Sequence, residues 1–193
     1  MSSVLDSVRR TVIISQVIFF VPLGLCVAWI HTGAVNRDGI SYYGVHQPTL
    51  EIIAVSYLGA AVLLWRAARD LAESDRPREL GQGLRVVALG LPGLLLTPYP
   101  AGPVWNWSHM VIGVVSGLVE FGLAVDLVLR DPTLGTWVTG GVQLAGGLLA
   151  AASLPDWNFS YLLLGEVIFE LGFAGTMFRW LRPELVRSSE VPA

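Results

Sequence analysis

The chain has 193 residues, of which 53% are hydrophobic and 14% are charged, and its mean hydropathy is +0.61. The core of one water-soluble domain cannot bury this proportion of apolar residues, so the composition predicts an integral membrane protein. The sequence contains no basic stripe or nucleic-acid-binding motif, and the absence of lysine excludes any chemistry that needs a lysine Schiff base.

Apolar stretches follow one another along the whole chain. They lie at about residues 12–30, 50–65, 84–97, 107–129, 134–154 and 159–180. Most have close to the ~20 residues that a membrane-spanning helix needs. The third is the shortest, at about 14 residues or ~21 Å, and Pro92 favours a kink in it, so a re-entrant segment is the alternative there. The sequence predicts an all-α, polytopic membrane protein, with six transmembrane helices arranged as three helical hairpins in a single domain (1–193).

The distribution of arginine sets the predicted orientation. Eleven of the twelve arginines lie near the N-terminus, in the loop 66–83 or just after it at Arg85, beside Asp131, or near the tail 181–193, and only Arg37 lies on the opposite side. Arginine-rich loops stay in the cytoplasm. Both termini and the loop 66–83 are therefore predicted to be cytoplasmic, and a re-entrant third segment would break this partition.

A six-residue pattern, Pro-x-Trp-Asn-aromatic-Ser, occurs at residues 103–108 and again at 155–160. After each copy the chain continues into an apolar stretch that carries Glu-x-Gly-x-Ala, at residues 120–124 and 170–174. A weaker copy, with tyrosine in place of glutamate, lies at 57–61. This similarity predicts an internal repeat of three hairpins, although glycine and alanine at helical spacing also suit any tightly packed membrane bundle.

The repeat makes two structural predictions. Tyr57, Glu120 and Glu170 should occupy equivalent positions in three helices. The glycines two residues after them should mark close helix contacts, because small side chains let helix backbones approach each other in a membrane. These glycines are Gly59, Gly122 and Gly172.

Carboxylates inside apolar helices are costly unless they have a partner or a task. Glu120 and Glu170 lie ~18 Å and ~15 Å from the start of their helices, so we expect them near mid-bilayer and facing each other, with Glu166 one turn away. Two carboxyl groups in one desolvated site do not both ionise readily, so at least one should hold a proton at neutral pH and serve as a general acid. The structural alternative is hydrogen bonding between helices with Gln143. Asp126 is expected to pair with Arg130 one turn later.

The predicted external face is rich in aromatic and polar side chains that could line the mouth of a cavity. The candidate substrate-binding residues are Glu51, Trp105, Trp107, His109, Gln143, Trp157, Phe159 and Tyr161. An interfacial aromatic belt is the alternative explanation for the aromatic members. The histidine spacing matches no metal or haem motif, so neither a metal nor a cofactor is predicted.

Three functions fit these patterns. In the first, an outward-facing cavity lined by aromatic and carboxylate side chains binds an apolar small molecule, a lipid or an isoprenoid. Glu120, Glu166 or Glu170 would then be the catalytic acid of a cyclase or isomerase. In the second, the same carboxylates bind and release protons in a proton-coupled transporter of small solutes, which at this size would need to form an oligomer. In the third, the protein is a non-catalytic membrane subunit. Membrane lipids are expected partners in all three cases.

Overall fold

The structure, a computed structural model, describes residues 2–73, 77–154 and 160–182. This described part is helical and contains no strand. The long helices are α1 (Ser2–Trp29), α3 (Leu50–Leu71), α4 (Arg78–Leu96), α5 (Pro103–Arg130), α6 (Leu134–Ala152) and α7 (Leu162–Trp180). The short ones are α2 (Gly33–Asp38), η1 (Ile40–Gly44) and η2 (Tyr99–Ala101).

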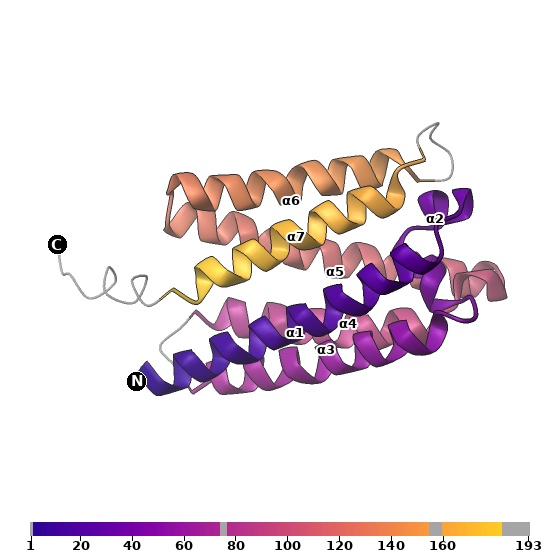
Figure 1. The fold of residues 1–193 in the computed structure, drawn as a ribbon. Coiled ribbons are helices and arrows are strands. Elements are labelled where there is room, and N and C mark those ends of the chain that lie inside the picture. The colour runs from indigo at the N-terminus through magenta and orange to yellow at the C-terminus, as the bar shows by residue number, and fades with distance from the viewer. Residues whose placement is uncertain (1, 74–76, 155–159, 183–193) are drawn as a thin grey trace.

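The long helices run side by side, and their ends gather at two opposite ends of the bundle (Figure 1). We call the end where α1, α4 and α6 begin and α3, α5 and α7 end the arginine end. The opposite end, which carries α2, η1 and η2, is the capped end. Nine of the ten described arginines lie toward the arginine end, and Arg37, in α2, is the exception. The partition expected from the sequence is therefore present in the fold.

Four helices are long and apolar enough to cross a bilayer: α1 from Val4, α3, α4 and α5. The protein is accordingly a helical membrane protein. The third stretch, whose length was in doubt, is a continuous helix of 19 residues that passes through Pro92. At 1.5 Å per residue α4 reaches ~28 Å, close to the thickness of the hydrocarbon core. The re-entrant alternative does not fit this geometry.

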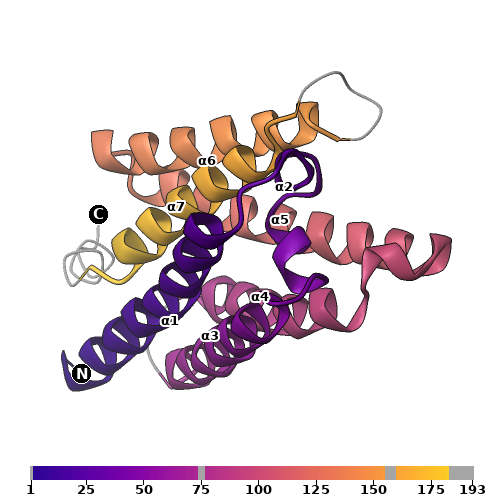
Figure 2. The ribbon, with the colours of Figure 1, turned by 45° about the vertical axis from the view of Figure 1, so that its right-hand side comes forward.

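The helices form two groups. In the N-half, α1 packs along α3 and α3 packs along α4, and in the C-half, α6 packs closely along α7 and more lightly against α5. The halves meet chiefly where α4 contacts α5, and to a smaller extent where α2 and α1 contact α7. Figure 2 shows the same separation after rotation, with α6 and α7 on the side opposite α3.

The predicted boundaries between the second and third helices are wrong. Residues 66–83 were expected to form a polar loop, but α3 continues to Leu71 and α4 starts at Arg78. The polar side chains of this stretch lie on one face of each helix, whereas Ala67, Leu71 and Leu80 are buried on the other. The amphipathic ends therefore extend the helices beyond the apolar stretches that mark them in the sequence.

The three glycines that the repeat predicted at close helix contacts differ in their surroundings. A Cβ atom on Gly172 would lie 2.5 Å from the backbone nitrogen of Gln143, so the expected close helix contact is confirmed there, between α6 and α7. At Gly59 the only neighbour is the side chain of Ile18, at 3.0 Å. The expectation for Gly122 is wrong, because that residue is exposed and has no atom within 4 Å of the Cβ position. Of the two six-residue patterns, the first does open α5, whereas residues 155–159 of the second lie outside the described residues.

The core is divided along the bundle axis. One hydrophobic cluster, with Leu64, Leu84, Leu127 and Met177 among its members, fills the half toward the arginine end. A second, with Phe19, Leu23, Ile53, Tyr57 and Leu163 among its members, fills the half toward the capped end. Along α1, Ser15 and Gln16 separate members of the two clusters, and along α7 Glu170 does the same. Glu120 on α5 lies within electrostatic range of Glu170, and Glu166 lies one turn from Glu170 toward the capped end. A polar layer therefore lies at mid-depth.

Candidate functional site

Glu120 is the most buried acidic residue of this layer, with 4% of its surface exposed. Its Oε2 atom has no hydrogen-bond partner among the described residues. The structure brings Glu120 on α5 close enough to Glu170 on α7 for their carboxyl groups to interact electrostatically. Two acidic groups separated by 50 residues in the sequence thus lie within electrostatic range of each other inside the C-half, and we call them the acid pair.

Tyr57 joins this pair from the other half of the bundle. The buried Tyr57 ring stacks on Phe19, with 5.8 Å between ring centroids, and its phenol lies within electrostatic range of Glu166 and Glu170. We call Tyr57, Glu120, Glu166 and Glu170 the acid cluster. It contains the three residues that the repeat pattern aligns, together with Glu166, and it combines a side chain of α3 in the N-half with side chains of α5 and α7 in the C-half.

The acid cluster has no cationic partner in the described part of the chain. The ion pairs there are Arg69 with Asp70, and Arg130 with Glu79 and Asp126, all toward the arginine end. A buried carboxylate that lacks a cation is costly, and taking up a proton removes the charge. The arrangement is therefore suited to holding a proton. No group of three or more histidine, cysteine, aspartate or glutamate side chains within the described residues is arranged to bind a metal ion.

Glu166 has a second, structural contact. The backbone N–H of Ile40 donates a hydrogen bond of 2.6 Å to Glu166 Oε2. Gly39, just before it, has φ +68°, and a Cβ atom there would collide with the same carboxylate. Only glycine can combine this backbone conformation with such a close approach. Glu166 therefore ties α7 to the short helices at the capped end.

These short helices act as a cap, which we define as residues 33–44 and which Figure 2 shows extending from α7 toward α3. Val35, Ile40 and Tyr43 of the cap are buried in the second hydrophobic cluster. The Tyr43 hydroxyl donates to the Ile30 carbonyl at 2.8 Å. Burial raises the pKa of Tyr43 to about 12, so the phenol stays protonated and keeps this bond at physiological pH. The cap is therefore packed into the bundle, where it contacts α3 and α7, two of the helices that carry the acid cluster.

His109, a predicted substrate-binding residue, fastens the cap to α4 and α5. Its Nδ1 lies 2.8 Å from the Thr97 carbonyl, which can only accept, so Nδ1 carries the proton. Nε2 is then the acceptor for the Ser41 hydroxyl at 2.7 Å. Both ring nitrogens are thereby used in contacts that hold the cap in place.

Tyr99 and Asp38 add a further link beside His109. The Tyr99 ring lies edge-on to the imidazole, with 5.8 Å between centroids, and its hydroxyl donates to Asp38 Oδ2 at 2.9 Å. Burial and the hydrogen bond to Asp38 raise the pKa of the Tyr99 phenol, which therefore remains a donor. Sequence reasoning missed Ser41 and Thr97 as partners of His109, because neither carries a motif and their contacts join segments distant in the chain.

The remaining predicted site residues do not join the acid cluster. Trp105 and Trp107 in the first turns of α5, and Tyr161 before α7, are 46%, 64% and 53% exposed. These exposures are typical of an interfacial belt. Glu51 is exposed in the first turn of α3. Trp157 and Phe159 lie outside the described residues.

Gln143 is fully buried between α6 and α7. Its Oε1 accepts a long hydrogen bond, 3.4 Å, from the Thr176 hydroxyl, and its Nε2 has no partner among the described residues. This bond links Gln143 to Thr176 across the α6–α7 interface, so we assign Gln143 a role in helix packing.

Two surface hollows lie toward the arginine end. One, of about 530 Å³, lies between α1 and α3 beside Arg10 and Arg66. The other, of about 420 Å³, lies between α4 and α5 beside Gln82 and Asp126. Neither lining includes a member of the acid cluster.

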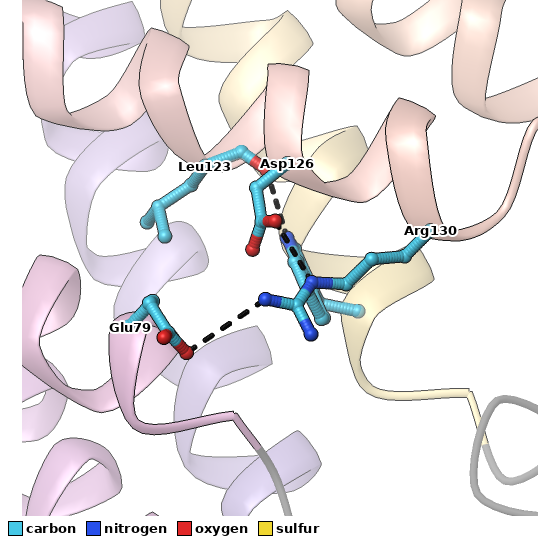
Figure 3. Close-up of polar contacts among 5 residues, drawn as sticks. Glu79, Leu123, Asp126 and Arg130 are labelled. Carbon is cyan, nitrogen blue, oxygen red and sulfur yellow. Dashed lines mark hydrogen bonds and ion pairs between the residues drawn. The ribbon is translucent and has the colours of Figure 1, made fainter. Parts of the chain in front are cut away.

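Figure 3 shows the ion pairs beside the second hollow. Arg130 pairs with Asp126 at 2.8 Å, which confirms the expected contact. It also reaches Glu79 on α4 at 3.8 Å and lies over the Trp180 ring, 5.8 Å from the centroid. The sequence indicated the first pair through its i, i+4 spacing and gave no sign of the other two contacts.

Comparisons with known protein families, with curated proteins and with solved structures find no match to this chain.

Proposed function

We propose that all six long helices cross the membrane as three hairpins, α1–α3, α4–α5 and α6–α7, with both termini in the cytoplasm. The arginine partition supports this orientation. The lengths of α6 and α7 support it as well, because each has 19 residues, as α4 does. The internal repeat belongs to the same proposal: Tyr57, Glu120 and Glu170 favour it by sharing one cluster, and the exposed Gly122 counts against it.

Cysteine labelling tests this topology. Thr32 at the capped end and Ala72 at the arginine end are both exposed, and the native Cys26 is buried. In Thr32→Cys, a membrane-impermeant maleimide should react from outside the cell. In Ala72→Cys, it should react only after the membrane is opened. Labelling of both variants from the same side would contradict the topology.

We propose further that the protein binds an apolar small molecule, a lipid or an isoprenoid, and that Glu120 and Glu170 act on it as a neutral acid pair. The observation that carries this proposal is the pairing of the two carboxyl groups in an apolar interior without a cationic partner among the described residues. A protonated carboxyl group can donate a hydrogen bond or a proton, as isomerisation or cyclisation of a lipid-like substrate requires. Its apolar surroundings favour a ligand with little charge.

Retention of the ligand tests this function. The full chain is purified in mild detergent as wild type, Glu120→Gln, Glu170→Gln and the control Glu51→Gln, whose carboxylate is exposed. Organic extracts are then compared by mass spectrometry. We expect an apolar compound in the wild type and the control that is lost or altered in the two interior variants. Equal extracts from all four proteins, or no retained compound in the wild type, would contradict the proposal.

Proton-coupled transport is the second candidate. Its support is the position of the acid cluster between the two halves, at mid-depth, where transporters built from two bundles bind their substrates. Reconstitution into liposomes that enclose a pH-sensitive dye separates the candidates. A transporter would move protons in response to a solute gradient, and Glu170→Gln would stop this movement. The third candidate, a structural subunit whose acid cluster only links helices, predicts a negative result in both assays. The wild type would then retain no apolar compound and move no protons, while the variants fold normally.

A further inference from the structure

The hollow between α1 and α3 has an unusual distribution of charge for a membrane-facing groove. Arg10 approaches it from α1 and Arg66 from α3, and Asp6 is the one acidic residue of its lining. Within the described part of the chain, neither arginine forms an ion pair. Two arginines from different helices therefore line one space of about 530 Å³, and neither is paired with a carboxylate in the described part of the chain.

The rest of the lining changes from polar to apolar along α1. Ser7 and Thr11 lie beside the arginines, and Ile14 and Leu63 form the apolar part of the lining. The Thr11 hydroxyl donates to the Ser7 carbonyl at 2.9 Å, so its proton is already used within α1.

An exposed apolar stripe continues from this lining toward the middle of α1. Ile14, Val17, Val21 and Leu25 follow Arg10 at spacings of three and four residues, so they share one face of the helix. Their exposed fractions are 43%, 52%, 57% and 60%. A cationic hollow thus opens onto an apolar strip that is long enough for part of an acyl chain.

We infer that this hollow binds an anionic phospholipid, with its phosphate between Arg10 and Arg66 and one acyl chain along the exposed face of α1. Arginine binds phosphate oxygens in a bidentate manner, and the two guanidinium groups can approach one phosphate from two sides. Basic pockets between helices on the cytoplasmic side of a membrane suit anionic headgroups. A free phosphate ion would use the arginines alone, whereas a phospholipid also covers the stripe. This inference goes beyond the proposed function and concerns the arginine end of the bundle, where no member of the acid cluster lies.

Lipid titration followed by native mass spectrometry tests the inference. The full-length protein in neutral detergent is titrated with phosphatidylglycerol or with phosphatidylcholine. The variants are Arg10→Gln, Arg66→Gln, the double variant and the control Arg85→Gln. Arg85 is exposed on α4 toward the same end and lies outside the lining of the hollow.

We expect phosphatidylglycerol to bind more tightly than phosphatidylcholine. Each of Arg10→Gln and Arg66→Gln should weaken its binding about fivefold, since one basic residue near anionic lipid contributes ~1 kcal/mol. Arg85→Gln should change binding less than about twofold, and Asp6→Asn should strengthen it. The site is overturned if Arg85→Gln weakens binding as much as Arg10→Gln, if phosphatidylcholine binds equally well, or if inorganic phosphate displaces the lipid. Thermal unfolding of each variant establishes that it is folded.

Discussion

The backbone N–H of Ile40 donates a 2.6 Å hydrogen bond to the carboxylate of Glu166, and this contact joins the cap to α7. Glu170 lies one turn further along the same helix. The same helix therefore carries the anchor of the cap at Glu166 and one member of the acid pair at Glu170. A change in the cap can reach Glu170, and through it Glu120, along this single turn of α7.

Gly39→Ala should loosen this junction. Alanine at φ +68° is strained, and its Cβ atom would collide with the Glu166 carboxylate, so we expect a loss of about 1–3 kcal/mol in the free energy of unfolding. Thermal unfolding in detergent measures the effect. Gly33→Ala is the matched control in the same segment, because no atom lies within 4 Å of its Cβ position. Equal stability of the two variants would show that the Glu166 contact is unimportant.

The hydrogen bond between Ser41 and His109 should stabilise the cap. A double-mutant cycle with Ser41→Ala and His109→Ala is expected to give a coupling energy of about 0.5–1.5 kcal/mol, the usual contribution of one such bond. Amide hydrogen exchange in residues 33–44 should become faster in either single variant. The prediction fails if the two substitutions add without coupling, or if exchange in the cap stays as slow as in the wild type.

Gly172 and Gly122 should respond in opposite ways to the same substitution. Gly172→Ala places a methyl group against the backbone of Gln143 and pushes α6 and α7 apart. We expect it to lower the free energy of unfolding by about 1–3 kcal/mol. Gly122→Ala meets open space and should be neutral or stabilising by up to ~1 kcal/mol, because alanine favours a helix. Chemical unfolding of both variants measures the difference. A large loss of stability in Gly122→Ala would instead indicate that Gly122 and Gly172 make equivalent close contacts.

The sequence predicted those features that depend on neighbouring residues or on the membrane. Apolar length located the six long helices, and arginine placement matched the two ends of the bundle. The i, i+4 spacing of Asp126 and Arg130 gave their ion pair. Each of these is encoded within a few residues or in the partition between water and lipid.

Features that depend on tertiary contacts could not be predicted in this way. The cap is held by bonds from Ile40 to Glu166 and from Ser41 to His109, which join residues 126 and 68 positions apart. No local pattern marks such partners. Glu166 and His109 stood out in the sequence as polar residues in apolar surroundings, and sequence reasoning assigned them to a ligand. In the structure both have partners in the cap, whereas Glu120, which interacts electrostatically with Glu170, keeps a carboxyl oxygen without a hydrogen-bond partner among the described residues.

The central claim is that at least one carboxyl group of the Glu120–Glu170 pair is neutral at pH 7. Infrared difference spectroscopy between the wild type and the Glu120→Gln/Glu170→Gln double variant tests it directly, since a protonated carboxyl group and a carboxylate absorb at separate frequencies. The account predicts that the double variant loses a protonated-carboxyl band, while the exposed control Glu51→Gln loses only carboxylate absorption. A difference spectrum that contains carboxylate bands alone would contradict it.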